Sequence, residues 1–323
     1  MYNVLVTGVG AVIGYGIVRS LRAMERPVRI IGMDIYDDAV GQHWCNHFER
    51  AALAAAPEYP DFIRSLIHKH SVDLVIPGIE QDVSRMVRDS SAWTGMNVKF
   101  VLNNPGLIAI CADKWHTACS LAEAGFPMIK TRIDGNFDEL AQEFSIPFLL
   151  KPRRSYASKG IQKICTESDL EYWRNKLGDN FMVQEIIGDD ENEYTVAAFG
   201  YGDGTCGQKL IFQRKLSGEG ATAKARVVSI SELDTVVDDL TMHLKPVGPT
   251  NFQFRFHAGR FLLLEINPRL SSSTSLRTAF GYNEAEMCVE YYLEGKRPDE
   301  RTIRPGRAVR YIEDIVTYDS DTV

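Results

Sequence analysis

The sequence predicts an α/β fold, with an N-terminal parallel-sheet domain followed by two units that mix helices and strands. Apolar runs alternate with helical patterns over the first third of the chain, which is typical of strand–helix–strand units. The middle third breaks into short strands around helical patterns, and the last third holds a helix, two adjacent apolar strands and a further helix. We place the three units at residues 1–110, 111–182 and 183–323.

The overall composition is that of a globular protein without a large basic surface. Hydrophobic residues make up 45% of the chain and charged residues 24%, and the net charge is −7, so we expect no nucleic-acid partner. The apolar runs are too short for a membrane span, and we expect no membrane contact. The six cysteines are scattered without a C-x-x-C pair, which favours a reduced, cytoplasmic protein with neither zinc nor disulfides.

The N-terminal domain is predicted from strands and helices that alternate along the chain. Its end is marked by Pro105 and Gly106, which interrupt the pattern in "KFVLNNPGL". The expected strands cover residues 3–8, 28–35 and 72–79, and the expected helices cover residues 13–24 and 59–70.

The turn after the first strand raises the question of a dinucleotide site. Gly8, Gly10 and Gly14 stand between an apolar strand and a helix, one residue wider than the G-x-G-x-x-G pattern. Asp34 ends the second strand, about where a ribose ligand would lie. An NAD(P) oxidoreductase would use the turn in this way. The alternative is that the glycines only let the helix pack closely on the strand.

The remaining two units are predicted from short strands and amphipathic helices. Lys215, Lys224 and Arg226 lie in a basic, glycine-broken segment, residues 212–228, that we interpret as a mobile loop rather than a substrate site. A strand-like stretch near the end of the chain has no predicted partner. The expected strands cover residues 147–152, 160–165, 181–187, 193–200, 206–216, 250–257, 260–268 and 308–316, and the expected helices cover residues 113–125, 230–244 and 283–295.

The end of the strand over residues 260–268 carries polar residues that point to metal and phosphate chemistry. Glu265, Asn267 and Arg269 alternate, which places their side chains on one face. A hairpin with the preceding strand would bring Gln253 alongside. One carboxylate and two amide oxygens suit Mg²⁺, and Arg269 supplies a fixed cation for a phosphoryl group. We therefore predict Gln253, Glu265 and Asn267 as metal ligands.

This E-x-N-P-R pattern, preceded by N-x-Q-F at residues 251–254, resembles the ATP-grasp superfamily, and most of all a single synthetase half-domain of the carbamoyl-phosphate synthetase large subunit. Three further motifs follow the family's order, at residues 113–127, 148–161 and 182–196. The resemblance implies a Rossmann-like domain over residues 1–110 that shapes the substrate side and does not bind NAD. The two parts of an ATP-grasp α+β domain would follow, a small subdomain and then a large subdomain with the metal site.

The resemblance also implies roles for individual residues at the positions of these motifs. Lys114, Lys151 and Arg269 would be the catalytic cations around the phosphates. The backbone of Glu185 and Ile187 would meet the adenine edge. The implied cofactors are ATP and Mg²⁺, with Mn²⁺ as a substitute, and the implied nucleotide-binding residues are Lys114, Lys151, Ser155, Ser158, Gly160, Glu185, Ile187 and, for the ribose hydroxyls, Glu193.

The function that the resemblance implies is an ATP-dependent carboxylate–amine or carboxylate–thiol ligase that forms an acyl phosphate and releases ADP and phosphate. Its partners would be a small-molecule carboxylate and an amine or thiol acceptor, and a homodimer is left open. Two departures matter: the phosphate loop has only Gly160, and Ser272 stands where the synthetase domains have a second arginine. The glycine-poor loop keeps open a nucleotide-binding regulatory module without turnover, and Ser272 argues against bicarbonate or carbamate chemistry. The oxidoreductase is the less favoured alternative.

Overall fold

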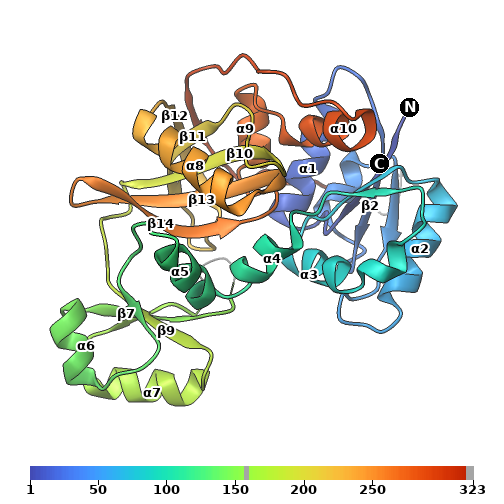
Figure 1. Cartoon of the computed structure of the whole chain (residues 1–323). Helices are drawn as coiled ribbons and strands as arrows, with labels where there is room; N and C mark the ends of the chain where they lie inside the picture. Colours follow the sequence, from blue (N-terminus) through green and yellow to red (C-terminus); the bar gives the residue numbers. More distant parts are fainter. Residues whose placement is uncertain (156–159, 318–323) are drawn as a thin grey trace.

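Three β-sheets organise the molecule, as the computed structural model shows (Figure 1). The structure describes residues 1–155 and 160–317. The N-terminal sheet and the C-terminal sheet lie side by side in the body of the molecule, and the middle sheet projects from it together with two helices (Figure 1). None of the helices in these described ranges is long and apolar enough to cross a membrane.

The N-terminal sheet is parallel and has the strand order β3-β2-β1-β4-β5. Its inner strands are almost fully buried because helices cover both faces: α1 packs on Val4 and Val6, and α2 and α3 pack on the face of Leu5. The strands are β1 (Asn3–Thr7), β2 (Arg29–Asp34), β3 (His47–Arg50), β4 (Leu74–Ile76) and β5 (Lys99–Phe100), and the helices are α1 (Val12–Arg22), α2 (Tyr59–His70) and α3 (Glu80–Arg88).

The glycines of the first turn have a packing role. Gly8 has a φ of +61°, and a Cβ on Gly14 would lie 2.0 Å from the carbonyl oxygen of Gly8. A Cβ on Gly78, just after β4, would lie 2.2 Å from the carbonyl oxygen of Thr7 and 2.7 Å from the Cα of Gly14. Helix α1 therefore meets the ends of β1 and β4 backbone against backbone, which only glycine permits.

The middle sheet is a small antiparallel sheet with the order β6-β9-β7-β8, covered by α6 and α7. Its core includes Phe144, Phe148 and Ile164. Capping boxes at Asn136 and Thr166 begin the two helices. The elements are β6 (Thr131–Arg132), α6 (Phe137–Phe144), β7 (Phe148–Pro152), β8 (Gln162–Ile164), α7 (Glu167–Leu177) and β9 (Phe181–Gln184).

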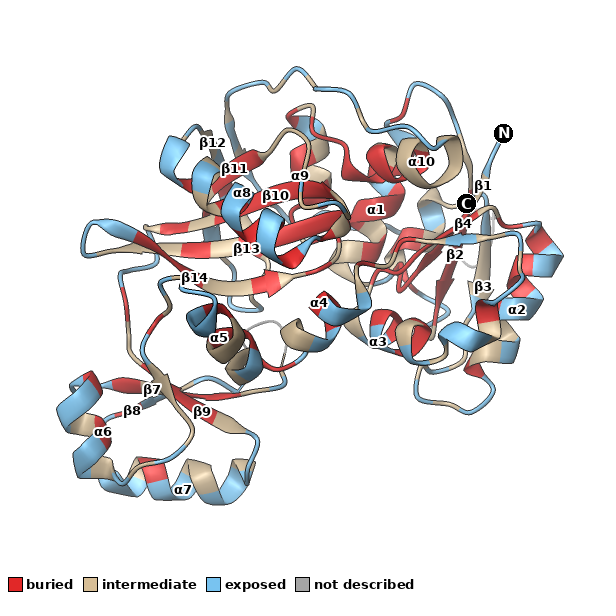
Figure 2. Ribbon diagram, in the orientation of Figure 1, coloured by how far each residue is buried: buried red, intermediate tan, exposed pale blue. Residues whose placement is uncertain are grey.

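The C-terminal sheet is antiparallel, with the order β14-β13-β10-β11-β12-β15, and helices cover both of its faces. Helices α4, α5 and α8 pack on one face, and α1, α9 and α10 lie on the other. Its strands contain the continuous buried segments visible in Figure 2. The elements are α4 (Pro105–Cys111), α5 (Lys114–Glu123), β10 (Glu193–Tyr201), β11 (Leu210–Leu216), β12 (Thr222–Val228), α8 (Ser231–Leu244), β13 (Val247–His257), β14 (Arg260–Asn267), α9 (Thr274–Ala279), α10 (Glu284–Glu294) and β15 (Arg307–Val309); short 3₁₀ helices cover Val40–Trp44 and Ser90–Trp93.

The structure corrects one prediction in full and another in part. Residues 212–228, expected to be a mobile loop, form β11, a turn and β12, because the backbone groups of β12 pair with β11 on one side and β15 on the other. The strand expected over residues 308–316 forms only over Arg307–Val309, where it pairs with β12; the prediction was wrong for residues 310–316, which form no strand. Helix α5 packs on the C-terminal sheet through Leu121, although it lies within residues 111–182.

Two glycines of α1 offer a matched test of this packing. We expect Gly14→Ala to be strongly destabilising, by more than the roughly 1–3 kcal/mol usual for overpacking, because the new methyl group meets backbone atoms that cannot rotate away. Gly16→Ala is the control, since its Cβ would lie 3.8 Å from the nearest atoms, on Ser275. It should be neutral, or stabilising by up to about 1 kcal/mol, because alanine favours the helix. Urea denaturation measures both, and equal effects would contradict the packing role.

Candidate active site

The predicted metal ligands come together on neighbouring strands of the C-terminal sheet. In the β13–β14 hairpin, Gln253 lies opposite Glu265 and Asn251 opposite Asn267. Glu265 and Asn267 are partly exposed while Ile266 between them is buried, as the alternation predicts. A register irregularity follows Gln253 and bends the hairpin at this point. The sequence pattern thus located this cluster of oxygens.

Two lysines approach the same edge of the sheet from other elements. Lys114, the first residue of α5, has its Nζ 3.6 Å from Oε1 of Glu265 and 2.6 Å from the carbonyl oxygen of Ser155. Lys151 at the end of β7 donates to Oε1 of Gln184 over 2.7 Å and is 7% exposed. Burial and, secondarily, the charge of Lys114 lower the pKa of Lys151 to about 8. The site therefore holds concentrated positive charge.

The two lysines face a narrow gap between the middle sheet and β14. A cavity of about 20 Å³ lies there, lined by Lys114, Lys151, Gln184 and Glu265 among others. Met128 and Leu263 form a β-bridge across the gap. This space is far below the several hundred Å³ of an ordinary small-molecule site. A nucleotide would enter only if the middle sheet moved away from β14.

The predicted adenine contacts lie just after the end of β9. Ile187 is buried in a small cluster with Ile129 and Leu262. The N–H of Glu185 donates to the carbonyl oxygen of Lys130. Both residues follow Gln184, which lines the gap, and their contact with adenine stays a prediction.

Two arginines that were not predicted as site residues bind side chains that were. One of these side chains is a predicted metal ligand, and the other is the predicted ribose contact. Arg214 donates to Oε1 of Gln253 over 2.6 Å, and it forms an ion pair with Glu193 over 2.9 Å. Arg255 lies 2.7 Å from the other oxygen of Glu193. In this conformation the Gln253 oxygen already accepts from Arg214, and both oxygens of Glu193 are paired with arginines. Both groups therefore keep less acceptor capacity for a metal or for ribose hydroxyls. Glu265 and Asn267 are the ligands that fit a hard cation best.

The catalytic arginine candidate connects the two large parts of the molecule. Nε of Arg269, two residues after β14, donates to Oε2 of Glu80 at the start of α3 over 2.5 Å. Nη1 of Arg269 donates to the carbonyl oxygen of Leu270 over 2.9 Å, which fixes the guanidinium. Glu80 was not predicted, because an acidic residue at a helix start ordinarily indicates only a favourable helix-dipole position.

A second cavity, of about 280 Å³, lies between the end of β14 and the start of α3. It is lined by Glu80, Glu265, Asn267 and Arg269 and by residues of the turn between β11 and β12. Asn251 also lines it, and the Nδ2 atom of Asn251 is buried without a hydrogen-bond partner in the described part of the chain. The Oδ1 atom of Asn251 accepts from Arg277, a fully buried arginine. The unused donor is therefore held in place next to this cavity.

The segment predicted as the phosphate loop is described only in part. Ser155 accepts from Lys114 through its carbonyl oxygen, and Gly160 has a φ of +80° where a Cβ would lie 2.8 Å from Cγ of Pro152. Ser158 lies outside the described residues. At the position of the missing second arginine, the carbonyl oxygen of Ser272 accepts from Arg310, which follows β15.

A family model and several solved structures match this chain. The family model, described as ATP-grasp in the biosynthetic pathway with Ter operon, matches residues 178–315. The N5-carboxyaminoimidazole ribonucleotide synthetase from Thermus thermophilus has a TM-score of 0.72 at 15% identity, over 95% of this chain and 81% of that one.

Two carboxylase structures with bound nucleotides are similar as well. A biotin carboxylase–β-γ-ATP complex from Campylobacter jejuni has a TM-score of 0.74 at 17% identity, over 94% of this chain and 74% of that one. The biotin carboxylase domain of the Hydrogenobacter thermophilus 2-oxoglutarate carboxylase, in complex with MgADP, ADP and bicarbonate, has a TM-score of 0.71 at 14% identity over 94% and 73%. These likenesses, together with the family model, confirm the expected resemblance: the chain has the fold of the ATP-grasp superfamily.

Proposed function

We propose that this protein is an ATP-dependent ligase that joins a small-molecule carboxylate to an amine or thiol through an acyl phosphate. The observation that carries the proposal is the convergence of Lys114, Lys151, Glu265, Asn267 and Arg269 at one edge of the β13–β14 hairpin. Cations and hard oxygen ligands at one place are what phosphoryl transfer requires. The matched family model and the nucleotide-bound structures of similar fold support it.

In this proposal the chain's residues mainly bind and orient charge. Lys114 and Lys151 hold the inner phosphates of ATP, and Glu265 and Asn267 hold magnesium. A magnesium ion held by these two residues would neutralise negative charge on the phosphates, and Mn²⁺ is a chemically similar substitute. Arg269 lies next to the outer phosphate.

The proposed reaction has two steps. A carboxylate oxygen attacks the γ-phosphorus, the bond to the β-phosphate oxygen breaks, and ADP leaves. The acceptor then attacks the acyl carbon, inorganic phosphate leaves with the bonding electron pair, and the acceptor loses its proton. Fixed cations lower the barrier of both steps because negative charge develops beside them.

A second candidate, a nucleotide-binding module without turnover, is favoured by one observation. The hydrogen bond from Arg214 occupies the Gln253 oxygen. If Arg214 never releases the Gln253 oxygen, only Glu265 and Asn267 remain of the three expected metal ligands. Nucleotide binding would then persist while phosphoryl transfer would be slow or absent. A product assay separates the two candidates.

We expect a panel of amino, hydroxy and dicarboxylic acids to contain one that stimulates release of ADP and inorganic phosphate from MgATP. Hydroxylamine should trap the activated carboxylate as a hydroxamate, because it attacks the acyl phosphate. Glu265→Gln should lower the rate at least about a hundredfold, because it removes the only carboxylate of the predicted metal set. Glu191→Gln, at an exposed carboxylate paired with Lys215, is the control and should keep full activity.

Stoichiometric AMP and pyrophosphate would contradict the acyl-phosphate route. Nucleotide binding without ATP turnover over the whole panel would favour the binding module. A fully active Glu265→Gln variant would show that the metal assignment is wrong.

The pKa of Lys151 gives a further prediction. The folded protein holds this pKa near 8, below the usual lysine value of 10.5, so the free site loses the charge as the pH rises through about 8. Affinity for MgATP should therefore fall between about pH 8 and 10. Lys151→Met should bind roughly tenfold or more weakly at pH 7 and should lose this pH dependence. Lys215→Met, at an exposed lysine, is the control, and calorimetric titration is the measurement. An unchanged profile in Lys151→Met would exclude this lysine from phosphate binding.

A further inference from the structure

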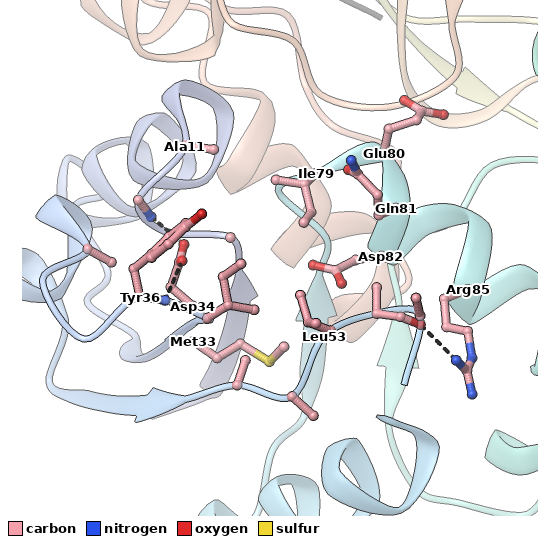
Figure 3. Close-up of a pocket in the computed structure, with 18 of the residues that line it drawn as sticks. Ala11, Met33, Asp34, Tyr36, Leu53, Ile79, Glu80, Gln81, Asp82 and Arg85 are labelled. Atoms are coloured by element: carbon pink, nitrogen blue, oxygen red, sulfur yellow. Dashed lines mark hydrogen bonds between the residues drawn. The ribbon is translucent and has the colours of Figure 1, made fainter. Parts of the chain in front are cut away.

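A large cavity lies in the N-terminal domain (Figure 3), and none of its lining residues belongs to the predicted nucleotide gap. It measures about 770 Å³ and opens outside the carboxyl ends of β1, β2 and β4. From β1 the chain first adds strands on one side of the sheet (β2, β3) and then on the other (β4, β5), so the order β3-β2-β1-β4-β5 has a topological switch point between β1 and β4. Open α/β sheets bind ligands at such a switch point. The volume is that of a small-molecule site.

Most of the cavity wall is apolar. Met33 and Leu53 lie on one side, and Ile79 faces them from the segment after β4 (Figure 3). The alanine-rich segment 51–55 after β3 and Ala39 complete this surface. An occupant would therefore be held mainly by burying apolar area.

Two buried carboxylates interrupt the apolar wall. Asp34 is 7% exposed, and its oxygens accept from the N–H groups of Gly10 (2.8 Å) and Tyr36 (3.1 Å). Asp82 is 3% exposed and accepts from the hydroxyl of Tyr59 over 2.7 Å. Neither carboxylate forms an ion pair with a cationic side chain within residues 1–155 and 160–317. Since a carboxylate offers about four acceptor positions, each retains room for a further donor.

The arginines that line the cavity do not offset these charges. Arg85 is committed: it donates to the carbonyl oxygens of Ala54 and Ala56 and to Asp89. Arg88 is exposed and lies 3.5 Å from Asp89. The inner surface of the cavity is therefore negative, which disfavours a phosphate or carboxylate on the occupant.

The cavity communicates with the proposed reaction site. Ala11, Ile79, Glu80 and Gln81 line both this cavity and the 280 Å³ cavity at Arg269. Glu80 itself is hydrogen-bonded to Arg269. A molecule of the right length in the larger cavity would reach the place where an acyl phosphate forms.

We propose that this cavity binds the body of the acceptor substrate, and that the acceptor is a mainly apolar molecule anchored at Asp34 and Asp82 by a cationic nitrogen group. The assignment as acceptor rests on the proposed ligase function; the class of ligand rests on the cavity alone. Cation and carboxylate form charge-assisted hydrogen bonds, which are strong in a surrounding of low polarity. The end that reacts is the part that reaches Glu80.

Asp82 has a cost in stability that this role would explain. Burial raises the pKa of Asp82, and repulsion from Asp34 raises it further. Hydrogen bonds from the hydroxyls of Thr7 and Tyr59 lower this pKa. The neighbouring Arg85 lies over the Tyr59 ring. Because the folded pKa is above the unfolded one, the carboxylate destabilises the protein at neutral pH, and the destabilisation decreases as the pH falls. Asp82→Asn should therefore raise the midpoint of urea denaturation at pH 7, and less so near pH 4.

Calorimetric binding with matched probes tests the proposal. The probes are cyclohexylmethylamine, phenethylamine and tryptamine, each with the alcohol and the carboxylic acid of the same carbon skeleton. For wild-type protein we expect at least one amine to bind tenfold or more tightly than its alcohol, and no acid to bind. Asp82→Asn should reduce the amine preference to threefold or less. Asp38→Asn removes an exposed carboxylate at the same cavity and should leave the preference unchanged.

Equal binding of amines and alcohols, binding of acids, or no binding by any probe would overturn the proposal. So would an equal loss in Asp38→Asn, since the effect would then be one of net charge. If Asp82→Asn fails to fold, the wild-type series alone decides. MgATP binding is measured in parallel: nucleotide binding without an amine preference overturns only this inference, whereas an amine preference without nucleotide binding overturns only the ligase function.

Discussion

The packing of helix α1 is the constraint on which the rest of the structure depends. One side of the helix touches the backbone of β1 and β4 through Gly14, and the opposite side packs on α9 and α10. One hydrophobic core therefore runs from Val6 in the N-terminal sheet through Ile17 in the helix to Phe212 in the C-terminal sheet. Because such cores are close-packed, the two sheets hold a fixed relation to each other.

This fixed relation brings together groups that are distant in the chain. Glu80 and Arg269 are 189 positions apart and form a hydrogen bond because α3 and the end of β14 meet at the boundary of the two parts. The same boundary joins the cavity of the N-terminal domain to the cavity beside Glu265. By contrast, the middle sheet has its own core and a narrow gap towards β14. A rigid boundary between the two large parts, facing a middle sheet with its own core, would suit the proposed reaction of two substrates with ATP.

The sequence allowed the central strands and the polar cluster to be predicted because their patterns are local. A run of four apolar residues before Glu265 identifies a buried strand, and alternation then fixes the facing residues. Strand β3, "HFER", has no apolar pattern and exists because β2 offers it a pairing edge. The bonds of Arg214 to Gln253 and Glu193 cross three strands, so no local pattern announces them. The glycine turn was ambiguous until the contacts of Gly14 showed what it packs against.

Hydrogen–deuterium exchange with and without MgATP tests most directly where the nucleotide binds. We expect slower exchange of backbone amides in residues 181–187 and 261–267, which lie at the gap that would receive ATP. We expect unchanged exchange in residues 7–14, where the glycines serve packing. Protection confined to residues 7–14 and 34–36, with none at the gap, would contradict the account and return the glycine turn to the role of a nucleotide site.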